Sequence, residues 1–186
     1  MRIIQHNLSM RGIKLQYGFT LIELLIVLSI TVILSIMSLG TCKSFLQKSR
    51  SDTLQTQLLS AIHLARSEAV LLGDKTILCG SNDQQTCSGI FENGYLIKSS
   101  TRVIYHFSHA IPEGIIHWRS FPISKPYLEF YSDDTKHSQN GTFWFCRSTA
   151  AKPAWAIVLN KSGRTREAFP DKNGNILDDK GNRLIC

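Results

Sequence analysis

A single carboxylate, Glu23, lies near the start of a long apolar segment of the chain. A charged side chain inside a membrane costs roughly 2.5–3.5 kcal/mol or more unless it finds a partner, so an isolated acid of this kind is a functional candidate. A cut after Gly18 would turn the backbone nitrogen of Phe19 into a positively charged chain end. The amine of one copy could then neutralise Glu23 of a neighbouring copy, which is the chemistry that a stacking subunit needs.

The apolar segment, residues 19–39, carries one formal charge. As a helix that rises about 1.5 Å per residue, it is long enough to span a hydrocarbon core of roughly 30 Å. Its hydroxyl side chains can bond to their own helix: Ser29, Thr31, Ser35 and Ser38. Three basic residues and no acidic residue precede it: Arg2, Arg11 and Lys14. The positive-inside rule therefore predicts a cytoplasmic N-terminus, with the rest of the chain outside the cytoplasm.

Two other interpretations of this segment compete. A secretory signal peptide fits poorly, because the apolar run is longer than a signal-peptide core and contains Glu23. Residues 38–40, Ser-Leu-Gly, match a small-x-small cleavage site only weakly. A plain single-span anchor would leave Glu23 without an explanation.

The run Gly18-Phe19-Thr20-Leu21-Ile22-Glu23 resembles the prepilin peptidase signature of type IV pilins and type II secretion pseudopilins. The resemblance implies cleavage between Gly18 and Phe19 by the prepilin peptidase, N-methylation of Phe19, and pairing of Glu23 with that terminus during assembly. Its expected partners are other major and minor pilins or pseudopilins and the inner-membrane assembly platform. Gly40 replaces a proline that many pilins carry, and Met10 offers a second possible start that would shorten the leader.

The rest of the chain begins with a helical pattern. Apolar residues recur at three- and four-residue steps, which predicts an amphipathic helix whose stripe packs on a globular domain. The stripe consists of Leu54, Leu58, Ile62, Ala65, Ala69 and Leu72. Gly73 predicts the end of a helix of about 50 residues. The expected organisation is a leader at 1–18, a transmembrane and assembly helix at 19–39, its amphipathic continuation at 40–73, and a β-rich periplasmic domain at 74–186.

After Gly73 the pattern becomes that of short strands, which predicts antiparallel sheets. The expected strands are residues 76–79, 94–98, 102–107, 115–118, 127–130, 141–146 and 154–159. The last two look like a hairpin pair. Asn-Gly pairs at residues 93–94, 140–141 and 173–174 predict turns.

Two further stretches narrow the resemblance. Residues 61–69, Ala-Ile-His-Leu-Ala-Arg-Ser-Glu-Ala, and residues 156–164, Ala-Ile-Val-Leu-Asn-Lys-Ser-Gly-Arg, are similar to the GspH/FimT/FimU group of minor pilins and pseudopilins. The likeness runs over nearly the whole mature chain, least between residues 80 and 131. It implies an α+β fold, with a long N-terminal helix packed on a globular domain of two antiparallel β-sheets, and a minor subunit near the filament tip.

Five cysteines lie after the apolar segment. In an oxidising extracytoplasmic compartment we expect disulfides. Four cysteines allow three pairings, and the simplest joins Cys79 to Cys87 and Cys146 to Cys186. Cys42 would be left over as a free thiol. No two cysteines have C-x-x-C spacing, so the sequence does not favour zinc, and we expect no metal or other cofactor.

The residues Gly163-Arg164-Thr165-Arg166 are the strongest binding candidate outside the apolar segment. On an extended strand Arg164 and Arg166 leave the same face, and such a fork suits phosphate oxygens, with Lys161 assisting. In FimT-type competence pilins a similar Gly-Arg-x-Arg element binds DNA, so the resemblance implies double-stranded DNA as a partner. Relatives without that role share the Gly-Arg pair, which leaves Arg166 as the discriminating residue.

The competing interpretation is a solvated hairpin turn. Its arginines would pair with Glu167 and Asp171, and Asp178 and Asp179 would further reduce any positive patch. Residues 171–175 faintly resemble a calcium loop, but the glycine is misplaced for an EF-hand. The formal net charge of +7 falls to +4 without residues 1–18, which permits an anionic partner without demanding one.

Catalysis has no support, because the histidines at 63, 106, 109, 117 and 137 form no metal-binding or triad-like pattern and no phosphate loop is present. We therefore expect no enzyme, and the resemblance implies a minor type IV pilin that takes part in pilus assembly at the inner membrane, with DNA binding as a further hypothesis. The alternatives are the H-type minor pseudopilin of type II secretion and a membrane-anchored periplasmic binding domain.

Overall fold

The computed structural model describes residues 18–108, 114–132, 139–147, 152–178 and 180–186. The predicted leader up to residue 17, Asp179, and the side chains of residues 37–43, including the thiol of Cys42, lie outside the described part. The chain divides into an N-terminal unit, Met1–Gln47, and a globular unit, Lys48–Cys186. The helix α1 (Leu21–Leu72) contributes to both units.

The start and end of α1 follow from local hydrogen bonding. Thr20 caps the helix: its side chain accepts the N–H of Glu23 at 3.3 Å, and its carbonyl accepts the N–H of Leu24 at 3.2 Å. The helix ends where Gly73 takes a left-handed φ of 62°. It has 52 residues, so the prediction of one helix of about 50 residues that stops at Gly73 is confirmed.

In the N-terminal unit, hydroxyl groups bond to their own helix as predicted. Ser29 donates to the carbonyl of Ile26 at 2.8 Å, and Ser35 donates to that of Thr31 at 2.7 Å. Among the residues that the structure describes, no helix is both long enough and apolar enough to cross a membrane.

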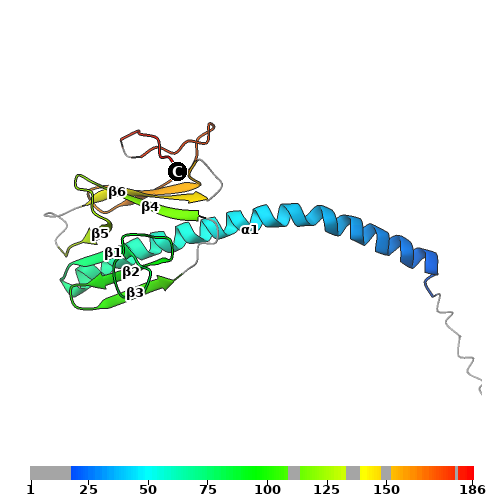
Figure 1. Ribbon diagram of the computed structural model, residues 1–186, viewed down its shortest axis with the longest axis horizontal. Helices are drawn as coiled ribbons and strands as arrows, with labels where there is room; N and C mark the ends of the chain where they lie inside the picture. The colour runs from blue at the N-terminus through cyan, green and yellow to red at the C-terminus, as the bar shows by residue number, and fades with distance from the viewer. Residues whose placement is uncertain (1–17, 109–113, 133–138, 148–151, 179) are drawn as a thin grey trace, which may run out of the picture. The chain divides into compact units, whose positions relative to one another are not determined.

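One antiparallel sheet of the globular unit has the strand order β3-β2-β1-β5 (Figure 1). Strands β2 and β3 pair as an antiparallel hairpin. The strands of this sheet are β1 (Thr76–Gly80), β2 (Gly94–Ser99), β3 (Val103–Ser108) and β5 (Tyr127–Phe130).

The other antiparallel sheet has the order β4-β6-β7-β8, so β8 is an edge strand. The expected hairpin of β6 and β7 is confirmed, with Phe143 opposite Ile157. Its strands are β4 (Gly114–Phe121), β6 (Asn140–Arg147), β7 (Trp155–Leu159) and β8 (Thr165–Ala168).

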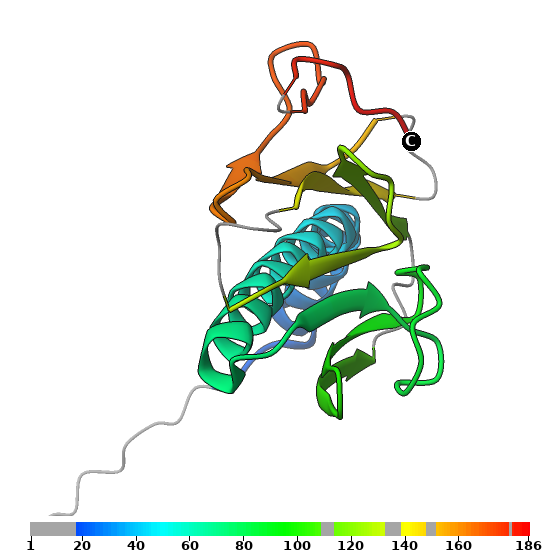
Figure 2. The same cartoon turned by 90° about the vertical axis from the view of Figure 1, so that its left-hand side faces the viewer.

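The main core lies where both sheets meet the part of α1 that belongs to the globular unit, as Figure 2 shows with α1 between the two sheets. Five residues of the predicted stripe are buried there: Leu54, Leu58, Ile62, Ala65 and Ala69. The sixth, Leu72, is 39% exposed, because it is the last helical residue and lies beyond the sheet-covered turns. The indole of Trp155 joins sheet and helix by donating to the backbone carbonyl of Ser51 at 3.0 Å.

A second, smaller core covers the opposite face of the β4-β6-β7-β8 sheet. Here the described residues of the C-terminal tail, 169–178 and 180–186, fold back over the strands (Figure 2). Its members are Ala156, Val158, Ala168, Ile176 and Leu184, with Trp144 packed against them. The tail therefore forms an outer layer that hides the side of the sheet facing away from α1.

Both disulfides favoured from the sequence are present, Cys79–Cys87 and Cys146–Cys186. The turn predicted at residues 140–141 is wrong, since Asn140 and Gly141 lie within β6. Glycine is needed there for another reason: a Cβ atom at Gly141 would lie 2.4 Å from the ring of Trp118. The Asn-Gly pair thus leaves room for an indole on the neighbouring strand instead of reversing the chain.

Candidate functional site

The turn that leads into β8 is held by the side chain of Asn160. Its Oδ1 accepts the backbone N–H of Ser162 at 3.1 Å and that of Arg164 at 3.0 Å. The backbone closes the same turn, because the N–H of Asn160 donates to the carbonyl of Arg164 at 3.1 Å. Gly163 takes a φ of 70°, a left-handed conformation that glycine adopts without strain. We call residues 160–166 the arginine turn.

One side of the arginine turn rests on α1. The hydroxyl of Thr165 lies 3.4 Å from Nε2 of His63, and Glu167 accepts the side-chain amide of Gln55 at 3.1 Å. A Cβ atom at Gly163 would lie 3.5 Å from the guanidinium carbon of Arg66. These contacts orient the odd-numbered residues of β8 toward the helix.

The even-numbered residues of β8 leave the opposite face, since side chains alternate along a strand. Arg166 lies opposite Val158 in the ladder, and Ala168 lies opposite Ala156. Both partners belong to the smaller core on the outer side of the sheet. By this alternation Arg166 lies on that outer side, and Arg164, which precedes β8 in the arginine turn, is exposed as well. The fork that the sequence predicted is compatible with this arrangement.

The acidic residues that could neutralise this fork have other partners. Glu167 accepts from Gln55 across the sheet, and Asp171 accepts the backbone N–H groups of Asn173 and Asn175, both at 2.8 Å. Asp178 accepts Nη2 of Arg119 at 2.8 Å. The fourth acid, at position 179, lies outside the described residues.

Across residues 18–108, 114–132, 139–147, 152–178 and 180–186, no ion pair involves Lys161, Arg164 or Arg166. The pairs with Glu167 and Asp171 that the competing interpretation expected are therefore not formed in this part of the chain. Three exposed cationic groups, one lysine and two arginines, stand on one turn and the strand that follows it.

The predicted assembly residues lie at the start of α1. Phe19 is 82% exposed, and Glu23 lies in the first helical turn, where the N-terminal dipole of a helix favours an acidic side chain. Gly18 immediately precedes them. These residues belong to Met1–Gln47, whereas the arginine turn belongs to Lys48–Cys186.

The described residues contain no group of three or more His, Cys, Asp or Glu side chains that could hold a metal ion. The segment that faintly resembles a calcium loop uses Asp171 to accept N–H groups of its own turn. Two sites thus stand out by their geometry: an N-terminal one with a single acid, and a basic turn at the edge of a sheet.

Comparison with protein families matches residues 55–163 to the family described as "Type II transport protein GspH", which is more than half of the chain. The chain belongs to the GspH family. This family consists of pilin-type structural components. A second match, to the prokaryotic N-terminal methylation motif, covers residues 13–39. That motif implies a membrane-anchored subunit of the pilin and pseudopilin type, processed by the prepilin peptidase and assembled with other pilins.

Two solved structures resemble the chain, both of the type IV minor pilin FimU of Pseudomonas aeruginosa (strain PAO1) in different crystal forms. The first has a TM-score of 0.47 and 16% identity, with 63% of this chain and 90% of FimU covered. The second has a TM-score of 0.46 and 15% identity, with 62% and 90% covered. No curated protein matches the chain.

The GspH match ends at Gly163, so Arg164 and Arg166 lie outside the matched segment, within three residues of its end. The residue that sequence reasoning missed is Asn160, whose side chain holds the turn. A signal was available: Asn or Asp followed three residues later by glycine occurs at positions 160, 171 and 178. Nothing in the sequence pattern indicated that His63 and Arg66 of α1 lie next to this turn.

Proposed function

We propose that this GspH-family chain is a minor type IV pilin that takes part in pilus assembly at the inner membrane and contacts double-stranded DNA through the arginine turn. In this proposal the chain is cleaved after Gly18 and methylated at Phe19. Residues 19–39 hold it in the membrane with its C-terminal domain in the periplasm. Glu23 then pairs with the processed amine of a neighbouring subunit at the assembly platform.

The apolar surface of the N-terminal unit supports the assembly part of the proposal. The large apolar side chains from Leu21 to Ile36 are 50–78% exposed. A continuous apolar surface of this kind marks contact with a membrane or with other proteins. Within it Glu23 is the acidic residue of the first turn, so it is available to a cation supplied by a neighbour.

Replacement of Glu23 tests assembly. Glu23→Ala and Glu23→Leu should abolish incorporation of the protein into sheared surface filaments, because each leaves the neighbour's amine without a counter-charge. Glu68→Ala, which removes a carboxylate further along α1, is the matched control and should incorporate normally. Mass spectrometry of the purified protein should find a methylated Phe19 as the first residue. Normal incorporation of both Glu23 variants would contradict the assembly mechanism.

The observation that carries the DNA part is the pair of exposed arginines in the arginine turn and the start of β8, with no acid paired to them in the described residues. Arginine contacts phosphate oxygens in a bidentate manner, and a phosphate contact carries no sequence information. We therefore expect binding that is salt-sensitive and largely independent of sequence.

The DNA part is tested by fluorescence anisotropy with the full chain in non-ionic detergent and a labelled duplex. The Arg164→Ala/Arg166→Ala variant should weaken binding at least tenfold at about 0.1 M salt and lower the salt slope by about 1.8, because two phosphate contacts are lost. Lys172→Ala removes a lysine from a neighbouring turn of the tail and serves as control. Equal binding by the double variant and the wild type would refute this role.

The family description favours a second candidate, the H-type minor pseudopilin of type II protein secretion. Deletion separates the two, since loss of pili or of natural transformation supports the pilin and loss of exoprotein release supports the pseudopilin. A third possibility, a membrane-anchored periplasmic binding domain, requires that the mature protein keeps residues 1–18. The same mass spectrum of the N-terminus decides that point.

A further inference from the structure

Three turns in the last part of the chain share one geometry. They are residues 160–164, 171–175 and 178–182, and each begins with Asn or Asp and has glycine at its fourth position. The glycines Gly163, Gly174 and Gly181 take φ values of 70°, 72° and 81°. In each turn the backbone N–H of the first residue donates to the carbonyl of the fifth, at 2.9–3.1 Å.

The side chain of the first residue accepts the same two hydrogen bonds in all three turns. Its Oδ1 accepts the N–H groups of the third and fifth residues. The distances are 3.1 and 3.0 Å at Asn160, 2.8 and 2.8 Å at Asp171, and 2.9 and 2.8 Å at Asp178. Asparagine and aspartate therefore build the same turn, and the chain itself provides the comparison between them.

The three positions differ in charge and in surroundings. Asp178 is compensated by Arg119, whose Nη2 donates to it at 2.8 Å. Asp171 follows the end of β8, whereas Arg164 and Arg166 lie at its beginning. The turn that carries the arginines is the one that begins with a neutral side chain. A carboxylate at position 160 would bond the N–H of Arg164 while adding a negative charge beside its guanidinium.

We propose that Asn160 is a positioning residue for an anionic ligand: its side-chain carbonyl holds Ser162 and Arg164 in the turn, and its neutrality keeps both arginines available to phosphate. The proposal rests on the DNA-binding part of the proposed function. Asparagine supplies the acceptor that the turn needs without repelling a phosphate or drawing a guanidinium away from it. Aspartate would supply only the first of these two properties.

The test compares four variants of the full chain in the anisotropy assay with duplex DNA. Asn160→Asp should keep the Tm of the wild type, as the two aspartate turns indicate, but bind DNA about threefold more weakly at about 0.05 M salt. Its salt slope should be less steep by up to about 0.9. Asn160→Ala removes the acceptor and should lower Tm by a few degrees.

The matched controls remove the negative charge at position 171, or transfer it to position 160, without changing the geometry of either turn. Asp171→Asn should keep the Tm of the wild type, and its DNA affinity should stay within twofold of the wild-type value. The combined Asn160→Asp/Asp171→Asn variant has the net charge of the wild type, so it should bind as weakly as Asn160→Asp only if the position of the charge matters. Wild-type binding by this combined variant would overturn the proposal.

The remaining outcomes separate the proposal from the function on which it rests. If Arg164→Ala/Arg166→Ala weakens binding and Asn160→Asp does not, the role of Asn160 is refuted and the DNA site stands. If the double arginine variant binds normally, the DNA site itself is refuted. A fall in Tm for Asn160→Asp as large as that for Asn160→Ala would refute the equivalence of the three turns.

Discussion

Two segments of the globular unit are closed by disulfides, and they keep their shapes in different ways. The loop between Cys79 and Cys87 is a short excursion from the end of β1, whereas Cys146–Cys186 fastens the C-terminal tail to β6. The loop makes most of its hydrogen bonds within itself. The tail also makes most of its hydrogen bonds within itself, but two side chains of the sheet that it covers, Arg119 and Trp144, donate to it as well.

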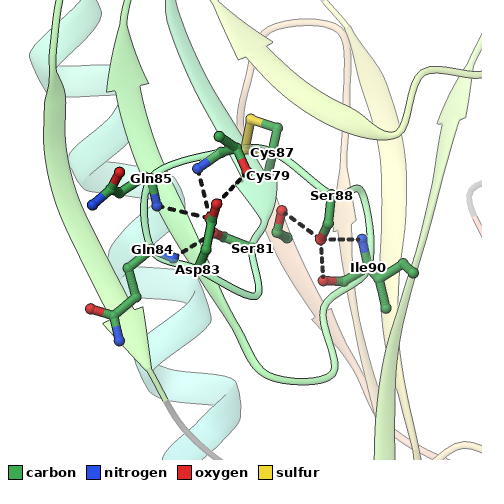
Figure 3. Close-up of a disulfide and its surroundings, with 10 residues drawn as sticks. Cys79, Ser81, Asp83, Gln84, Gln85, Cys87, Ser88 and Ile90 are labelled. Atoms are coloured by element: carbon green, nitrogen blue, oxygen red, sulfur yellow. Dashed lines mark hydrogen bonds between the residues drawn. A yellow bond between two sulfur atoms is a disulfide. The ribbon is translucent and has the colours of Figure 1, made fainter.

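The loop is organised around Asp83, as Figure 3 shows. This carboxylate accepts the backbone N–H groups of Gln85 and Thr86, at 3.0 and 2.8 Å, and the hydroxyls of Ser81 and Thr86. Hydrogen bonds from Thr86 and Gln85 hold the pKa of Asp83 well below its usual range. Ser88 closes the loop by donating its N–H to the carbonyl of Gly80 at 2.9 Å.

The tail, by contrast, is attached at separate points along the sheet. Trp144 donates its indole N–H to the carbonyl of Ile185 at 3.1 Å, and Arg119 donates to Asp178 at 2.8 Å. Ile176 is fully buried against the strands. A disulfide can therefore secure a segment that its own hydrogen bonds already order, or it can hold an outer layer against a sheet. Loss of each disulfide tests which of the two roles it has.

The largest effect is expected for Cys146→Ser/Cys186→Ser. The disulfide closes a separation of 40 residues, and chain entropy predicts a loss of about 4 kcal/mol in the free energy of unfolding. Denaturant unfolding measures this loss. Hydrogen exchange should show reduced protection of Leu184, because its attachment to the sheet is weakened. Unchanged protection there would mean that the tail is ordered without its disulfide.

The next largest effect concerns the apolar side of the tail. Ile176→Ala should lower the free energy of unfolding by about 3 kcal/mol, since a fully buried side chain would leave a cavity over the sheet. Leu177→Ala is the control, because Leu177 is 46% exposed and should cost less than about 1 kcal/mol. Equal losses for the two variants would show that the tail does not pack as described.

The sequence predicted the fold well where one local rule decides the structure. The apolar stripe and Gly73 predicted the extent of α1, and the strand patterns fell within about two residues of most of the observed strands. It failed at Asn140-Gly141, because the need for glycine comes from Trp118 on a neighbouring strand, and the sequence does not reveal that neighbour. Rules based on the residues of a turn cannot predict a contact between residues that are distant in the sequence.

The candidate site was predictable in its residue types but not in its electrostatics. Alternation along a strand predicted the common face of Arg164 and Arg166. Whether nearby acids pair with them depended on partners far along the chain: Gln55 for Glu167, and Arg119 for Asp178. Such partners become visible only when the tail and α1 are placed on the sheet.

A smaller effect is expected at the short loop. Cys79→Ser/Cys87→Ser should lower the free energy of unfolding by about 2.5 kcal/mol, because the unfolded chain gains freedom over a separation of 8 residues. Protection of the Thr86 N–H should persist in hydrogen exchange, since Asp83 still accepts it. Loss of that protection would show that the disulfide, and not the hydrogen bonds, orders the loop.

The smallest effect is expected at the ion pair that attaches the tail. Asp178→Asn keeps the acceptor that the turn needs, as Asn160 shows, but loses the negative charge that faces Arg119. Because the side chain of Arg119 is half exposed, the free energy of unfolding at pH 7 should fall by only about 1 kcal/mol. Burial raises the pKa of Asp178, but hydrogen bonds from Asn182 and Lys180 and the charge of Arg119 outweigh it, and the pKa is lowered overall.

Because the folded state lowers this pKa, the carboxylate stabilises the fold above its unfolded pKa of about 4, and this stabilisation is lost as pH falls further. The difference in stability between the wild type and Asp178→Asn should therefore shrink below about pH 4. Denaturant unfolding at pH 7, 4 and 3 measures it. A difference that stays constant across this range would show that the charge of Asp178 does not hold the tail.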